Sequence, residues 1–181
     1  SVFNLDWFQE LYTDLVPNNN LYMELTDSKF EARPFGIYTY PGTAESRVPY
    51  PTVIFNNAGS YNANNTFTVP ETGTYNFVVE NNYIMNRAPQ YATPTVITRI
   101  RVNGVEQAID SFTTPFGINQ YSYTANLTLN LIFTQGDVVE VTTRFTGSWG
   151  INYLDIDSKF KATVAPVTNS MSNLLKNDVK A

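Results

Sequence analysis

The chain contains neither histidine nor cysteine, and this absence excludes several kinds of chemistry. Nucleophile systems that pair serine or cysteine with histidine need an imidazole base. Zinc sites built on thiolates or imidazoles need the same two residue types. Disulfides and thiol redox chemistry are excluded for the same reason. We therefore expect a protein that is not an enzyme and that holds no metal and no cofactor.

Charge is also scarce, because charged residues make up only 15% of the 181 residues and the net charge is −5. An acidic chain is a poor partner for a phosphate backbone, so no nucleic acid is expected. No apolar run approaches the roughly 18 residues that a membrane-spanning helix needs. The first residues lack the basic and apolar regions of a secretion signal, which predicts no targeting segment in this sequence.

Aromatic residues, in contrast, are abundant at 14%, with 12 Tyr, 12 Phe and 2 Trp. This much aromatic and apolar mass argues against a disordered chain. The polar residues are mostly Asn and Thr, and Asn occurs in clusters such as Asn18-Asn19-Asn20 and Asn64-Asn65. Asn favours turns and Thr fits a half-exposed strand, so this composition indicates many strands joined by turns.

One helix is predicted, near the N-terminus, where Asn4 could cap it and Pro17 follows it. Its apolar residues recur at helical spacing: Leu5, Phe8, Leu11, Tyr12 and Leu15. We assign residues 1–50 to an N-terminal helix and an extended arm. The helix has two interpretations, docking on a partner protein or packing on its own domain, and we favour docking.

Strand-like alternation dominates residues 51–164, which we assign to one domain. The longest alternating run contains Tyr121, Tyr123, Ala125, Leu127, Leu129, Leu131 and Phe133. Asn103-Gly104 is a strong signal for a type I′ hairpin turn, and a phase shift after Tyr153 indicates a bulge or a bend. The pattern predicts an antiparallel sandwich or barrel. Residues 165–181 are polar and are assigned to a C-terminal tail that orders only when it docks.

Five short motifs in this domain resemble the globular head of complement component C1q. They are Val53-Ile54-Phe55 with Tyr61-Asn62, Phe67-Thr68-Val69-Pro70 with Gly73-Thr74-Tyr75-Asn76-Phe77, Ile100-Arg101-Val102-Asn103-Gly104, Gln135-Gly136-Asp137-Val138-Val139 after Leu127–Phe133, and Ser158-Lys159-Phe160. The resemblance covers residues 52–164 in the family's order. It implies an all-β jelly-roll sandwich, shared with tumour necrosis factor, in which members are usually tight trimers.

The resemblance also implies a role for Tyr121 and Tyr123, because aromatics near this region of the family pack around the three-fold axis. Without it they are ordinary core tyrosines. The sequence differs from the animal members in having no cysteine, no collagen-like stem and about fifty additional N-terminal residues. These differences argue against a role in complement or as a cytokine, but they do not affect the expected fold.

Three further groups of residues are candidate sites. Trp149, flanked by glycines, is a candidate ligand contact that could stack on a sugar, or it is a core side chain. Asp155 and Asp157 could bind calcium or act as a glycosidase pair, but we favour a solvated strand face. Arg99 and Arg101 could pair across a trimer interface, or they lie on a solvated face, and we favour the solvated face.

Together these observations predict a non-enzymatic viral structural protein located in the virion. The specific hypothesis is a homotrimeric spike, head fibre or capsid-decorating component of a bacteriophage. Its expected partners are itself, a neighbouring virion or capsid protein, and a host-surface glycan or receptor for host attachment. The alternative is a secreted, C1q-like module that binds a receptor or carbohydrate. A third interpretation is a polysaccharide-acting enzyme that uses a carboxylate pair.

Overall fold

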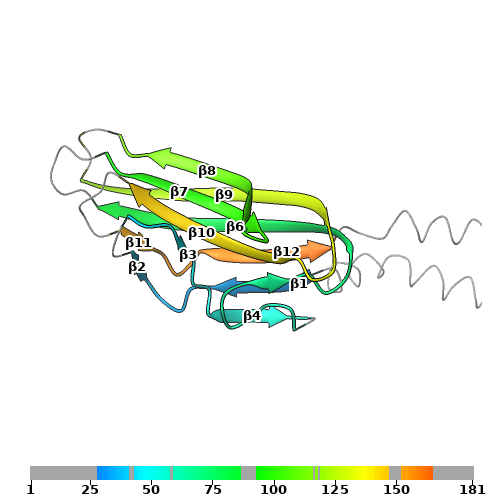
Figure 1. Cartoon of the computed structure of the whole chain (residues 1–181). Coiled ribbons are helices and arrows are strands. Elements are labelled where there is room, and N and C mark those ends of the chain that lie inside the picture. The colour runs from blue at the N-terminus through cyan, green and yellow to red at the C-terminus, as the bar shows by residue number, and fades with distance from the viewer. Residues whose placement is uncertain are drawn as a thin grey trace, which may run out of the picture. The chain divides into compact units, whose positions relative to one another are not determined.

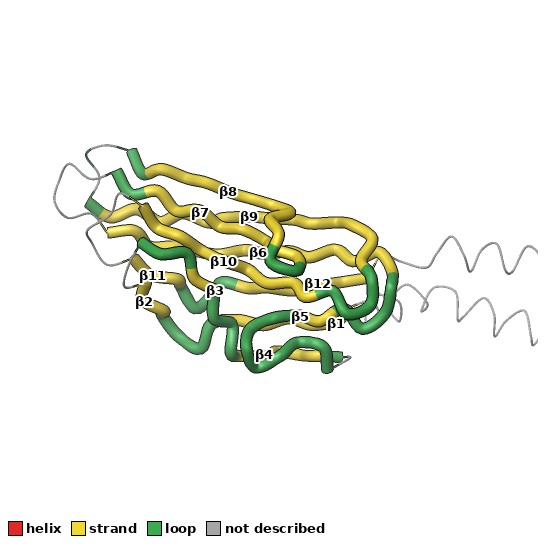
Figure 2. Tube along the Cα trace, viewed as in Figure 1, coloured by secondary structure: helices red, strands yellow, loops and turns green. Residues whose placement is uncertain are grey.

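The chain folds into two antiparallel β-sheets, as a computed structural model shows (Figures 1 and 2). The structure describes residues 28–40, 43–57, 59–86, 93–115, 117, 119–146 and 152–164. Residues 29–163 form one compact unit. The strands follow one another through turns and loops, and no helix occurs in the described ranges.

The first sheet has seven strands, in the order β2-β11-β6-β12-β1-β4, with β9 on the other side of β6. Its members are β1 (Ser28–Arg33), β2 (Tyr38–Tyr40), β4 (Thr52–Asn56), β6 (Gly73–Asn86), β9 (Gln120–Phe133), β11 (Asn152–Leu154) and β12 (Lys159–Val164). β6 and β9 pair along all of their length, from Gly73 opposite Phe133 to Asn86 opposite Gln120. This pair forms the longest ladder of the fold, and it matches the long alternation of the sequence.

The second sheet has five strands, in the order β3-β10-β7-β8, with β5 also paired to β10. They are β3 (Ser46–Arg47), β5 (Phe67–Thr68), β7 (Thr95–Val102), β8 (Val105–Thr113) and β10 (Val138–Thr146). The β7–β8 turn confirms the predicted hairpin, because Asn103 and Gly104 both have positive φ, at 51° and 80°. The Asn103 side chain also ties this turn to the start of β10, since its Oδ1 accepts from the Val138 amide at 2.9 Å.

Strands of both sheets begin before residue 51, so the predicted arm and the sandwich overlap. β1, β2 and β3 lie within residues 28–50, and β1 pairs with β4. Local signals indicate these strands only weakly, because the prolines and glycines of residues 33–50 are typical of loops. β1 begins and β12 ends at the same end of the sheets (Figure 1).

The phase shift after Tyr153 corresponds to a turn, not to a regular strand. β11 ends at Leu154, the turn follows at Ile156 and Asp157, and β12 begins at Lys159. Leu154 is buried and Ile156 is exposed. The predicted bend is confirmed, and Asp155 and Asp157 lie in this turn instead of on a strand face.

The core consists of the inward-facing residues of both sheets. On β6, for example, Tyr75, Phe77 and Val79 are buried and Thr74 and Asn76 face outward, as the alternation predicts. Aromatic rings fill much of this space, with Phe30 stacked on Phe67 at a centroid distance of 4.7 Å. Burial of this aromatic area is the main source of stability for the sandwich.

Candidate interaction surface

Several predicted site residues lie outside the part of the chain that the structure describes. They are the helix residues Leu5, Phe8, Leu11, Tyr12 and Leu15, and also Trp149 and the tail at 165–181. Their expected roles in docking and in ligand contact therefore stay predictions. The other candidates can be placed.

Tyr121 and Tyr123 face β8 within the same chain. Both rings stack on Phe112, and the Tyr123 ring lies at a centroid distance of 4.0 Å. The Tyr123 hydroxyl donates to Asp110 Oδ2 at 2.7 Å. Burial first, and then the hydrogen bond and charge of Asp110, raise the pKa of Tyr123 to about 12. These tyrosines help to close the sandwich between β8 and β9, and their place at a trimer interface stays a prediction.

Asp155 and Asp157 both accept hydrogen bonds from groups of the same chain. Asp155 Oδ1 accepts from the Ile156 amide at 2.7 Å, which is local turn chemistry. Asp157 accepts from Asn82 Nδ2 at 3.3 Å on each oxygen. The described residues contain no group of three acidic side chains that could hold a metal ion. Both carboxylates therefore have hydrogen-bond partners within the chain, and the calcium hypothesis stays untested.

Arg99 and Arg101 are paired inside the chain, which neither interpretation of the sequence anticipated. The guanidinium of Arg101 donates to both oxygens of Glu45, at 2.7 and 2.9 Å. Arg99 lies between Glu45 at 3.4 Å and Glu106 at 2.6 Å. The network holds the segment before β3 against β7 and β10. No local sequence signal predicts it, because Glu45 lies more than fifty residues from its partners.

The environment of Glu45 favours its charged form. Burial by itself raises the pKa of this carboxyl, but the hydrogen bonds from Thr142 and Arg101 and the charges of Arg101 and Arg99 lower it. The net effect is a pKa below the usual value of 4.5. The ion pairs among Glu45, Arg99, Arg101 and Glu106 therefore form a structural clamp on the outer face of the second sheet.

The outward face of β9 is uncharged. Between Gln120 and the exposed Ile132, alternate positions on this strand are exposed and carry short polar side chains: Ser122, Thr124, Asn126, Thr128 and Asn130. Serine, threonine and asparagine side chains can each both donate and accept hydrogen bonds. The alternation in the sequence places these five residues on one face of the strand, but only the fold shows that this face is exposed. Such a face suits contact with other polar surfaces without bringing charges together.

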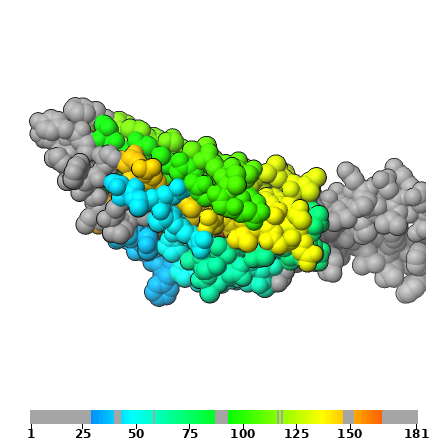
Figure 3. Space-filling view, in the orientation of Figure 1, coloured from blue at the N-terminus to red at the C-terminus, as the bar shows by residue number. Residues whose placement is uncertain are grey.

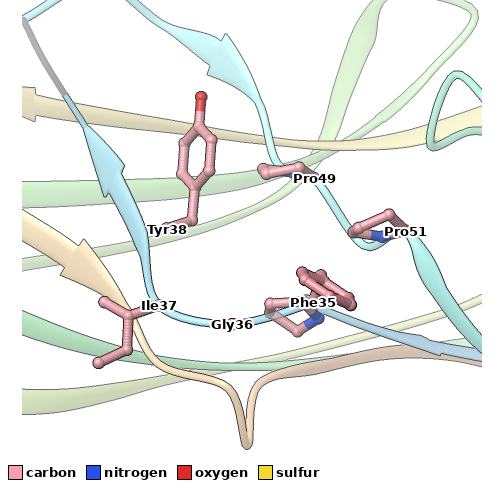
Figure 4. Close-up of a pocket in the computed structure, with 7 residues that line it drawn as sticks. Phe35, Gly36, Ile37, Tyr38, Pro49 and Pro51 are labelled. Carbon is pink, nitrogen blue, oxygen red and sulfur yellow. The ribbon is translucent and has the colours of Figure 1, made fainter.

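An apolar depression lies where β1 ends and β4 begins (Figure 4). Its lining is Pro34, Phe35, Gly36, Ile37, Tyr38, Pro49 and Pro51, and its volume is about 190 Å³. Sites for drug-sized ligands have volumes of roughly 300–1,000 Å³, so this depression fits a single side chain better than a small molecule. Phe35 and Ile37 are 84% and 62% exposed. No local sequence signal identifies this surface, because it forms only where residues 34–38 meet Pro49 and Pro51 in the fold.

No protein-family model and no curated protein matches the chain. Among solved structures, the Eiger TNF protein from S. frugiperda is similar at a TM-score of 0.51 and 15% identity, over 76% of this chain and 90% of that one. The globular domain of the zebrafish complement 1qA protein has a TM-score of 0.45 and 14% identity, over 75% and 94% of the two chains.

The likeness to the S. frugiperda structure and the two antiparallel sheets show that the described part of the chain has a jelly-roll sandwich fold, as that tumour necrosis factor protein does. The fold expected from the sequence motifs is thereby confirmed. At this level of identity the comparison concerns the fold alone. In the described ranges, no helix is long and apolar enough to cross a membrane.

Proposed function

We propose that this chain is a non-enzymatic structural protein that assembles as a homotrimer. The uncharged outward face of β9 carries the proposal. Around a symmetry axis, identical residues of different copies approach one another, and like charges at such positions are destabilising. A row from Ser122 to Asn130 without a charge avoids this repulsion. The trimers implied by the C1q resemblance agree with this arrangement.

The test places a charge on this face. We expect light scattering of the native protein to give three times the 20.4 kDa mass of one chain. Thr128→Glu would bring three like charges together and should shift the protein toward monomers, more strongly at low salt. Ser111→Glu, on an exposed position of β8, is the matched control and should leave the trimer intact. A native monomer at micromolar concentration would contradict the proposal.

The context that we propose is a virion, in which the N-terminal arm docks on a neighbouring structural protein. Residues 1–28 contain five acidic residues and no basic residue, together with the apolar stripe from Leu5 to Leu15. A short isolated helix is marginal in water, so such a stripe gains stability from the surface that it covers. The matching partner surface is an apolar groove with a basic rim.

Deletion of residues 1–20 tests this docking. It leaves every strand that the structure describes in place, because the first of these begins at Ser28. The truncated protein should therefore keep its melting temperature and its trimer mass but should fail to assemble onto particles. A melting temperature many degrees lower with normal assembly would show instead that the helix belongs to the fold. If the chain is instead a secreted C1q-like module, neither the native nor the truncated protein would assemble onto particles.

A further inference from the structure

The turn between β7 and β8 contains an asparagine followed by a glycine, a pair that occurs once in the chain, at Asn103-Gly104. Both residues have positive φ, and both are exposed. An asparagine in this pair is open to attack by the backbone nitrogen that follows it, because glycine has no side chain in the way and adopts many backbone angles. A Cβ at Gly104 would meet no atom within 4 Å, so the surrounding structure leaves room at this position.

The Asn103 side chain is held against the connection between β9 and β10. Its Nδ2 donates to Asp137 Oδ1 at 2.9 Å, and its Oδ1 accepts from the Val138 amide at 2.9 Å. Asp137 also accepts from the Thr134 amide, through Oδ2 at 2.9 Å. Figure 3 shows the green surface of the β7–β8 hairpin next to the yellow surface of the β9–β10 connection. One side chain thus joins two turns at the protein surface.

We propose that Asn103 is a site of spontaneous deamidation that its contacts with Asp137 and Val138 keep closed. In the reaction, the Gly104 backbone nitrogen forms a bond to Cγ of Asn103, the bond from Cγ to Nδ2 breaks, and ammonia leaves with the proton of the Gly104 amide. Water then opens the resulting ring at either carbonyl and yields aspartate or isoaspartate. For the attack, the Asn103 side chain turns toward its own backbone, so both of its hydrogen bonds break first.

The rate therefore depends on how often these contacts open. When a site closes again quickly, its reaction follows the population of the open form. A hydrogen bond to a carboxylate is roughly twice as strong as one between neutral groups. The bond from Asn103 to Asp137 is of this kind, so Asp137 supplies most of the protection.

The reaction changes the contact that has protected it. A carboxylate at position 103 would face the Asp137 carboxylate across the distance that the hydrogen bond now spans. Like charges so close together repel each other. The isoaspartate product in addition lengthens the main chain of the turn by one atom. Deamidation should therefore separate the β7–β8 turn from the start of β10.

Peptide mapping by mass spectrometry, after incubation of the full chain at mildly alkaline pH, measures the reaction. We expect Asn103 to deamidate at least about tenfold more slowly in the folded protein than in the same protein unfolded in urea. Asp137→Ala should speed the reaction of the folded protein by about tenfold. Thr72→Val is the matched control, because it removes the hydroxyl that accepts from the Gln135 amide in the same connection. It leaves the Asn103 contacts in place and should react at the native rate.

Three results would overturn the proposal or a defined part of it. An unfolded chain that keeps Asn103 intact would show that the site does not react. Equal rates in the folded and the unfolded native protein would show that the fold gives no protection, and this comparison does not depend on any variant. A folded Asp137→Ala variant that reacts at the native rate would remove Asp137 from the protection.

A reciprocal exchange tests the consequence of the reaction. Asn103→Asp reproduces one product and should lower the melting temperature. Asn103→Asp combined with Asp137→Asn exchanges the amide and the carboxylate, so a donor again faces an acceptor, and most of the loss should be recovered. If the single variant melts like the native protein, or if the exchange recovers nothing, repulsion between the two carboxylates is not what deamidation introduces.

Discussion

One half of the sandwich interior is filled by aromatic rings, whereas the other half is crossed by hydrogen bonds. In the aromatic half, Phe30 stacks on Tyr61 and Phe67, and Phe77 packs edge-on against Phe133 at 5.0 Å. In the polar half, the Tyr83 hydroxyl lies 2.6 Å from Thr143 Oγ1 and 2.9 Å from Thr98 Oγ1. Both halves are fully buried, so they differ in chemistry and not in exposure.

The polar half connects the two sheets through specific atoms. Tyr83 lies on β6 of the first sheet, and its partners Thr98 and Thr143 lie on β7 and β10 of the second. Asn81 Nδ2 donates to the Tyr83 hydroxyl, and Asn81 Oδ1 accepts from Tyr50, whose ring lies 5.6 Å from Phe160 of the aromatic half. Apolar burial is non-directional, whereas a buried hydrogen-bond network fixes one arrangement. The aromatic half therefore supplies most of the stability, and the polar half fixes the register between the sheets.

The largest expected effect comes from the aromatic half. Phe77→Ala removes a fully buried ring and leaves a cavity, which should lower the free energy of unfolding by about 3–5 kcal/mol. Denaturant titration measures the change. Phe35→Ala is the matched control, because this exposed ring should alter the monomer's stability by less than about 0.5 kcal/mol. Equal losses would contradict the assignment of the core.

The next largest loss of stability is expected in the polar half of the interior. Tyr83→Phe removes one oxygen and leaves Asn81, Thr98 and Thr143 without their shared partner, so it should cost about 1–3 kcal/mol. Tyr75→Phe removes a hydroxyl that donates only to the Glu71 carbonyl and should cost less. If the two variants lose the same stability in denaturant titration, the network has no special role.

A smaller effect appears at the β8–β9 contact. Tyr123→Phe loses the hydrogen bond to Asp110 and should cost about 1 kcal/mol at neutral pH. The folded-state pKa of Tyr123 is raised from 10.0 to about 12, so its contribution is present below pH 10 and is lost as the pH rises through 12. Stability measured from pH 9 to 12 should therefore fall less steeply in the variant than in the native protein. Parallel curves would be evidence against this proton linkage.

The smallest effect concerns the exposed clamp at Glu45. Glu45→Gln weakens the ion pairs with Arg99 and Arg101 and should cost less than about 1 kcal/mol, since solvent and salt screen them. The pKa of Glu45 is lowered, so its contribution is present above pH 4.5 and is lost as the pH falls through the lowered value. The difference from the native protein should shrink in acid and in high salt. Glu71→Gln, at an exposed carboxylate outside the clamp, serves as the control.

The sequence predicted the features that depend on neighbouring residues. The alternation from Tyr121 to Phe133 matches β9, and Asn103-Gly104 forms the predicted turn. Thr98 alternates with Ile97 and Arg99 along β7 and shares the inward face with Val96 and Ile100, but the hydrogen bond that makes its burial favourable comes from Tyr83, fifteen residues away. Periodicity can identify the face of a strand, but it cannot identify the atoms that meet that face.

What the sequence determined by itself is the all-β class, most strand faces and the absence of imidazole and thiol chemistry, because these follow from local periodicity and composition. The tertiary structure decided which distant groups meet. It paired Glu45 with Arg101, brought β1 beside β4 and left Phe35 and Ile132 exposed. Contacts of this kind depend on how the two sheets pack. The residues of one strand do not specify which distant residues will lie against them.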